Sequence, residues 1–180
     1  MIYFTADTHF GDERLNLYQR DLIASSAKEI DDLIIKNWND IVKDEDTIYH
    51  LGDFTTKKEF LPIANQLNGY KILIKGNYDD QFTDEELLRY FNEVYENRLV
   101  KGYYLNHYPN KGSMNYFNLV GHIHGLWKVQ RNMINVGCDA WHFKPISLER
   151  INFTKNAIIK HFDDNVFAGG LECNLKTIER

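Results

Sequence analysis

Cysteine is scarce in this chain of 180 residues, and long apolar runs are absent. The two cysteines, Cys138 and Cys173, lie far apart and form no CxxC pair, which predicts two free thiols in a reducing compartment. No apolar run approaches the roughly 18 residues that a membrane-spanning helix needs. The opening segment turns acidic at Asp7, too early for a signal peptide. We therefore expect a cytoplasmic protein with no membrane partner.

Basic clusters are also scarce. The formal net charge is −5, and the longest basic run is Lys57-Lys58. Proteins that bind long nucleic acids usually carry a basic stripe, so we expect no long nucleic-acid partner. Acidity does not exclude phosphate substrates, because bound metal ions can supply the positive charge. A small phosphate ester is the expected partner, and no pattern indicates the oligomeric state.

What the chain does contain predicts one folded α/β domain. Hydrophobic residues make up 43% and aromatic residues 14%, which argues for a packed core and against disorder. Short apolar runs alternate with amphipathic stretches, as in α/β proteins. We expect residues 1–180 to form a single domain. The tail 163–180 stays unassigned, because Gly169-Gly170 interrupts any pattern there.

Runs rich in β-branched and aromatic residues predict strands. The clearest are Ile2–Ala6, Thr47–Leu51, Tyr70–Lys75, Tyr103–Asn106 and Tyr116–Val120, with weaker candidates at Leu99–Lys101 and Met133–Val136. Capping boxes at Ser26–Glu29 and Thr83–Glu86 predict two helices. Further helices are expected over Phe60–Leu67, where Pro62 predicts a late start, and over Ser147–Phe162.

Residues that can bind a metal ion follow each of the five clearest strands. They are Asp7, His9, Asp53, Asn77, His107, His122 and His124. Sites in α/β proteins form beyond the carboxyl ends of strands, where loops converge. In extended chain, the i, i+2 spacing places both members of Asp7/His9 and of His122/His124 on one face. We therefore expect one shared pocket.

The donor types indicate the metal. Four imidazoles, two carboxylates and one amide oxygen suit Mn, Fe, Zn or Ni, with Mn expected first, and they are too rich in nitrogen for a Ca or Mg cage. Seven side chains exceed the needs of one ion. The set therefore predicts two divalent metal ions that share a ligand.

These motifs resemble those of the calcineurin-like metallophosphoesterase superfamily, whose pattern is DxH, GDxx, GNHD, a lone H and GHxH. Here the pattern reads Asp7-Thr8-His9, Gly52-Asp53-Phe54, Gly76-Asn77-Tyr78-Asp79, His107 and Gly121-His122-Ile123-His124. The segments Tyr49–Phe54 and Asn135–Gly137, with Trp141 and Lys144-Pro145, are similar to a small single-domain bacterial or phage subgroup.

The resemblance implies a four-layer α-β-β-α sandwich, in which helices flank two β-sheets. It implies that one ion is held by Asp7, His9, Asp53 and His124, and the other by Asp53, Asn77, His107 and His122. It further implies a metal-dependent hydrolase in which a hydroxide bridging the ions attacks phosphorus. Phosphodiesters are expected ahead of monoesters as substrates.

The chain departs from the family pattern at Tyr78, where the pattern has a histidine that protonates the leaving group or stabilises the transition state. Tyrosine titrates near ~10, so it is a poor general acid at neutral pH, although it can donate a hydrogen bond. Asp79 is expected to accept from the phenol. The candidate catalytic residues are Asp53, His9, Tyr78 and Asp79. A second departure is Asp12, where close relatives carry histidine.

Three explanations for Tyr78 stay open. In the first, the substrates have good leaving groups and need no acid. In the second, His50 or His142 supplies the proton from a neighbouring loop. In the third, catalysis has been lost. The last explanation makes the chain an interaction module that keeps its metal site. A nuclease is a third interpretation of the function, disfavoured by the missing basic stripe.

Overall fold

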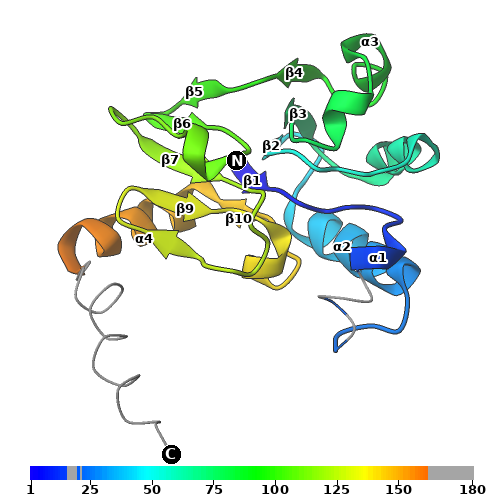
Figure 1. Ribbon diagram of the computed structural model, residues 1–180, viewed down its shortest axis with the longest axis horizontal. Coiled ribbons are helices and arrows are strands. Elements are labelled where there is room, and N and C mark those ends of the chain that lie inside the picture. Colours follow the sequence, from blue (N-terminus) through cyan, green and yellow to red (C-terminus); the bar gives the residue numbers. More distant parts are fainter. Residues whose placement is uncertain (16–19, 21, 162–180) are drawn as a thin grey trace, which may run out of the picture.

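The computed structural model describes residues 1–15, 20 and 22–161, so the tail 163–180 and Cys173 lie outside the described residues. The architecture is mixed α/β, with two five-stranded sheets and flanking helices, which confirms the predicted fold class (Figure 1). The first sheet has the strand order β10-β1-β2-β3-β4. Its strands are β1 (Ile2–Thr5), β2 (Thr47–His50), β3 (Tyr70–Ile74), β4 (Glu93–Tyr95) and β10 (Ile146–Ser147).

The second sheet has the order β5-β6-β7-β9-β8. Its strands are β5 (Arg98–Val100), β6 (Tyr103–Leu105), β7 (Phe117–Val120), β8 (Val129–Gln130) and β9 (Met133–Asn135). In each sheet the strands that precede predicted ligands run parallel to one another. Their carboxyl ends therefore share an edge, and the loops that follow them can converge on one site.

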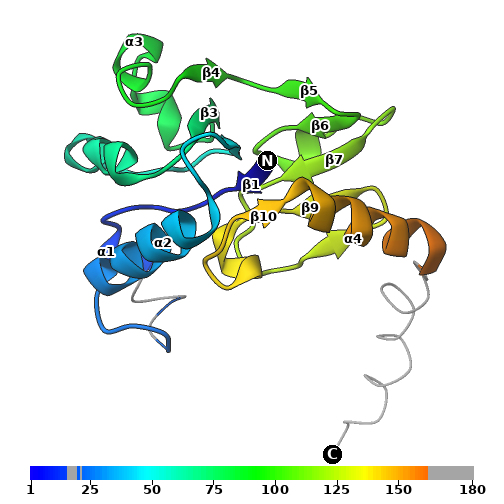
Figure 2. The same ribbon diagram turned by 180° about the vertical axis from the view of Figure 1, so that it is seen from behind.

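Helices and 3₁₀ helices connect the strands. The α-helices are α1 (Glu13–Leu15), α2 (Ala27–Ile41), α3 (Asp84–Leu87) and α4 (Leu148–His161), and the 3₁₀ helices are η2 (Lys58–Gln66), η3 (Asp79–Gln81), η4 (Pro109–Lys111) and η5 (Cys138–Trp141). Seen from either side, α2 and α4 lie toward opposite ends of the pair of sheets (Figures 1 and 2). None of the helices in the described ranges is long and apolar enough to span a bilayer.

Strands of the first sheet carry apolar side chains on both faces, because each face of this sheet packs against a core cluster. In β1, Tyr3 belongs to the core cluster that contains Trp38 of α2, whereas Phe4 belongs to the cluster that also contains Leu105 and Leu119 of the second sheet. Successive side chains of a strand point to opposite faces, so neighbours in β1 serve different cores. Packing on both faces fixes the position of β1 and of the residues that follow it.

Two local expectations are corrected by the structure. The helix around Pro62 starts early, at Lys58, because η2 is a 3₁₀ helix whose short turns tolerate the loss of one N–H. At α2, Ser26 accepts from the Glu29 N–H as expected, but the Glu29 carboxylate accepts from the Ser25 N–H and not from that of Ser26. The capping box at Thr83 is confirmed in both directions.

Candidate metal centre

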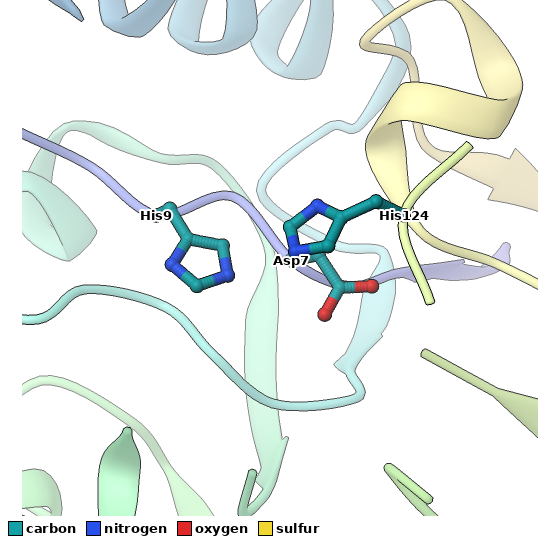
Figure 3. Close-up of side chains that lie close together, drawn as sticks. All are labelled: Asp7, His9 and His124. Atoms are coloured by element: carbon teal, nitrogen blue, oxygen red, sulfur yellow. The ribbon is translucent and has the colours of Figure 1, made fainter. Parts of the chain in front are cut away.

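The first group of ligands gathers beyond β1. Asp7 and His9 follow this strand, and His124 comes from the loop after β7. Their donor atoms all lie within 4.8 Å of one another. The imidazoles of His9 and His124 approach each other beside the Asp7 carboxylate (Figure 3), with ring centroids 5.0 Å apart. Two segments of the chain, far apart in sequence, thus deliver the donors of one ion-sized site.

The second group lies beside the first. Donor atoms of Asp53, His107 and His122 fall within 4.8 Å of one another. The Asn77 Oδ1 atom lies 3.2 Å from His107 Nε2 and 3.1 Å from His122 Nδ1, so this amide oxygen joins the group. The structure therefore brings together all seven residues predicted as ligands.

Asp53 lies between the two groups. Its Oδ2 atom is 3.6 Å from His9 Nε2 and 3.4 Å from His107 Nε2. Its Oδ1 atom accepts a hydrogen bond of 2.9 Å from the Tyr78 N–H, which fixes the orientation of the carboxylate. Gly76 makes room for this side chain, because a Cβ there would lie 2.4 Å from Asp53 Oδ1. The carboxylate is placed to serve both groups.

The backbone is strained where it presents the ligands. Among the described residues, positive φ angles occur at eight non-glycine positions, and five of them are ligands: Asp7, His9, Asp53, His122 and His124. L-residues avoid the left-handed region at a cost of about 1–2 kcal/mol each. Such strain persists only where the surrounding packing over-determines it, and it clusters at functional sites.

The residues fit two divalent cations. Both ring nitrogens of His9 are buried, and neither has a hydrogen-bond partner among the described residues. Burial lowers the pKa of His9 to about 4, so the imidazole is neutral at pH 7, the form that binds metal. Burial also raises the pKa of Asp7 to about 6, which shows that this carboxylate is poorly solvated and would gain from a cation.

Hydrogen bonds orient the ligand rings. His107 Nδ1 donates to the Leu51 carbonyl oxygen at 2.7 Å, and His124 Nδ1 lies 2.9 Å from Asp139 Oδ2. Each contact leaves Nε2 for an ion, as is usual for metal-binding histidines. Burial lowers the pKa of His107, but the Asp53 and Asp7 carboxylates outweigh it and raise the pKa to about 9. The second group therefore attracts positive charge.

Arg20 and Asp139 support the site and were not predicted. Arg20 is buried, and its guanidinium donates to Asp139 at 2.8 Å and to the carbonyl oxygens of Asp7 and Thr8 at 2.8 and 3.0 Å. Burial raises the pKa of Asp139, but His124 and Arg20 outweigh it and hold the pKa at about 2. A permanently charged Asp139 therefore positions His124. Asp139 follows the predicted strand Met133–Val136 and Gly137. The expectation that ligands lie beyond strand ends could therefore have identified it.

Asp139→Asn tests this positioning role. Loss of the charge weakens the hold on His124, and removing such a partner typically costs 10–100-fold in metal affinity or activity. We expect the Mn concentration that half-saturates the protein to rise by about tenfold. Glu149→Gln, an exposed carboxylate on α4, is the control. Equal Mn midpoints for the two variants would contradict the role of Asp139.

The structure places neither auxiliary histidine at the metal centre. His50 is buried in the core, where Thr8 Oγ1 lies 3.0 Å from its Nε2 and its ring stacks on Trp38. Burial lowers the pKa of His50 to about 3, so it holds no proton to give at neutral pH. His142 is exposed and lines a different pocket, together with Met1 and Tyr3. Neither of these two candidate proton donors therefore lies among the ligands, and His50 has the alternative role of a core residue at a strand end.

Tyr78 lies at the site, but Asp79 does not serve it as expected. The Tyr78 ring packs edge-on against His9, with centroids 5.2 Å apart. The buried Asp79 carboxylate instead accepts from the backbone N–H groups of Asp53 (2.7 Å), Gly76 (2.9 Å) and Phe54 (3.2 Å). Asp79 is thus a loop anchor and no partner for the phenol.

The second departure, Asp12, also has a structural role. Its carboxylate accepts from Arg14 Nε at 3.3 Å and Nη2 at 3.2 Å. Arg14 and Tyr78 line one cavity of about 470 Å³. Asp12 also lies 3.9 Å from His9 Nδ1. The two departures from the family pattern are therefore neighbours in the fold, joined through Arg14.

Comparisons with known proteins agree with this geometry. The sequence pattern of the calcineurin-like phosphoesterase family matches residues 1–167. An uncharacterized protein of Methanocaldococcus jannaschii is 30% identical over 166 residues, which span 83% of this chain and 88% of that protein. A solved structure of a protein of unknown function from Aquifex aeolicus matches with TM-score 0.65 and 31% identity, covering 86% of this chain and 98% of the other. A nuclease of Pseudomonas putida shares the fold at TM-score 0.50 and 20% identity, over 68% of this chain and 61% of the nuclease.

Proposed function

The chain belongs to the calcineurin-like phosphoesterase family, and from that membership we propose that it is a dinuclear-metal phosphoesterase that prefers phosphodiesters. The position of Asp53 carries the proposal, because one carboxylate oxygen lies within 3.6 Å of His9 and 3.4 Å of His107. A shared carboxylate is what two ions in one site require. Two bound divalent ions supply a nucleophilic water of lowered pKa and polarise the phosphoryl oxygens.

The protein's own residues fall into two ligand sets. We assign Asp7, His9, Asp53 and His124 to one ion, and Asp53, Asn77, His107 and His122 to the other. This mixture of imidazole nitrogens and carboxylate and amide oxygens suits Mn, Fe, Zn or Ni, and we take Mn as the first to test. Hydrogen bonds orient three of these ligands. His107 is held by the Leu51 carbonyl oxygen, His124 by Asp139, and Asp53 by the Tyr78 N–H.

The preference for diesters rests on the surroundings of the ligands. A cavity of about 700 Å³ adjoins His122 and His124, and it is lined by Ile123, Leu126 and Phe143. This apolar wall suits the organic group of an ester better than free phosphate. On the other side, the Tyr78 phenol and the Arg14 guanidinium offer hydrogen-bond donors to a leaving group or a phosphoryl oxygen.

A substrate panel tests the proposal. Protein loaded with Mn should hydrolyse bis(p-nitrophenyl) phosphate faster than p-nitrophenyl phosphate, and chelator should abolish both activities. Inactivity on every ester, with both ions bound, would favour the interaction module. Faster cleavage of single-stranded DNA or RNA than of small diesters would favour a nuclease, the activity of the Pseudomonas putida protein of the same fold. The net charge of −5 makes us expect small diesters.

Tyr78→His addresses the missing acid. An alkoxide leaving group needs a proton and a nitrophenolate does not, and general acid catalysis contributes about 10²–10⁴-fold. We expect the wild-type rate to fall steeply as the pKa of the leaving group rises. The variant should flatten that dependence and raise turnover on alkyl diesters at least about tenfold, with little change on nitrophenyl esters.

Tyr78→Phe is the matched control, since it removes only the hydroxyl. If wild type already cleaves alkyl diesters well and Tyr78→His gains nothing, another group assists the leaving oxygen. Arg14→Gln is then the next variant, because Arg14 shares a cavity with Tyr78 and its guanidinium, which keeps its proton, can stabilise that oxygen through a hydrogen bond. We also propose a cytoplasmic location, which the free thiol of Cys138 supports.

A further inference from the structure

A second pocket lies away from the metal centre, at the other end of β1. It has a volume of about 480 Å³, and its wall includes Met1 and Tyr3, whereas the metal ligands follow the carboxyl end of the same strand. The floor is apolar, since Tyr3, Pro145 and Ile146 are buried. We call it the basic pocket, because Lys128, Lys144 and Arg150 line it.

Among the described residues, no carboxylate lines the basic pocket, although the chain as a whole is acidic. Two acidic groups close by already pair with cations: Asp46 binds the Met1 amino group, and Asp40 pairs with Lys36 and also interacts with the charge of Lys144. Burial and the charge of Arg150 together lower the pKa of Lys128. The Lys128 and Arg150 cations therefore repel each other, and an anion between them would relieve the repulsion.

Trp141 gives the pocket an aromatic wall. Its Nε1 donates to the Asn135 carbonyl oxygen at 2.7 Å, which fixes the ring, and the Lys128 ammonium lies 3.8 Å from the ring centroid. The Lys128 cation thus covers one face of the indole. A ligand with both a flat apolar part and a phosphate suits this arrangement, because the phosphate would draw Lys128 off the ring and the flat part would take its place. Inorganic phosphate would use only the cations.

Hydrogen bonds connect this pocket to the metal centre. Asn135, which accepts from Trp141, donates through Nδ2 to the carbonyl oxygen of the ligand His124 at 2.6 Å and to that of Trp127 at 2.8 Å. Trp141 ends η5, and Asp139 of the same short helix binds the His124 ring. Lys128 follows the loop that carries His122 and His124.

We propose that the basic pocket is an effector site, which binds a small organic phosphate of about mononucleotide size and acts on the metal centre through the loop of His124. The ligand's phosphate would lie among Lys128, Lys144 and Arg150, and its apolar part against Trp141. This role is separate from hydrolysis, because the pocket contains none of the metal ligands.

Binding of adenosine 5′-monophosphate to the full chain tests the site. The titration uses metal-free protein, so that the metal centre cannot capture the phosphate, and it follows tryptophan fluorescence. We expect saturable binding whose Kd rises at least about tenfold in Lys144→Gln/Arg150→Gln. Lys28→Gln/Lys58→Gln removes the same charge from exposed positions on α2 and η2 and should leave the Kd unchanged. Equal Kd values for the two double variants, or inorganic phosphate binding as tightly as the nucleotide, would overturn the proposal.

A second measurement tests the connection to the metal centre. Saturating nucleotide should shift the Mn affinity of wild type severalfold, and it should shift that of Lys144→Gln/Arg150→Gln much less. An equal shift in both proteins would place the nucleotide at the metal centre and contradict an effector role. Neither experiment measures hydrolysis, so the effector site can fail while the proposed phosphoesterase activity holds, and the reverse.

Discussion

Asp53→Ala should lower kcat on a diester substrate by at least about a thousandfold, the largest loss expected for any single ligand. Its Oδ2 atom lies within reach of both ligand groups, so removing it opens both ion sites and leaves His9 and His107 with no shared anion. Steady-state kinetics with Mn in excess measures the effect, and Mn content measured on the same sample shows how many ions remain.

Asn77→Ala provides the graded comparison for Asp53. Among the described ligands, Asn77 pairs with His107 and His122, both of the second group, so this variant should weaken one ion and spare the other. Excess Mn should therefore rescue Asn77→Ala in part and Asp53→Ala hardly at all. Asp32→Ala, an exposed carboxylate paired with Lys28 on α2, should behave as wild type. Equal losses in the Asp53 and Asn77 variants would argue against a bridging carboxylate.

Asp79→Ala should destabilise the fold by about 3–5 kcal/mol, even without metal. Three buried backbone N–H groups, those of Asp53, Phe54 and Gly76, would lose their acceptor, and each unsatisfied donor costs about 1–3 kcal/mol. Urea unfolding in the presence of chelator measures this loss apart from any effect on metal binding. Because the Asp53 loop would shift, Mn affinity should fall as well.

Asp80→Ala is the matched control for Asp79, since the neighbouring carboxylate is exposed and lies 4.0 Å from Lys75. Its free energy of unfolding should change by less than about 0.5 kcal/mol. A loss below about 1 kcal/mol for Asp79→Ala would mean that water or a rearranged loop replaces the carboxylate. Asp79 would then not be an anchor.

The ligand set could be predicted because it depends on local pattern alone. Each ligand follows a strand, and parallel strands in layered sheets bring their carboxyl ends to one edge. His50 shows the limit of the same rule. It is the last residue of β2, but its side chain turns into the core against Trp38. Spacing predicts that a residue lies near a site, but packing decides which way its side chain points.

The supporting residues were harder to predict, because they depend on contacts between distant parts of the chain. Arg20 reaches Asp139 across 119 positions, and nothing around it in the sequence forms a motif. Asp79 was expected beside the phenol of Tyr78, yet three backbone N–H groups that converge on it settle its role. The strands missed, β4, β8 and β10, have only two or three residues, too few to show a hydrophobic period.

The Mn content of the reloaded protein tests the central claim most directly. Chelator-treated protein would be dialysed against increasing Mn, and bound metal would be counted per chain by elemental analysis. The arrangement of seven ligands around one shared carboxylate predicts saturation at two ions per chain in wild type. Saturation at one ion, or no binding at micromolar to millimolar Mn, would contradict a dinuclear centre.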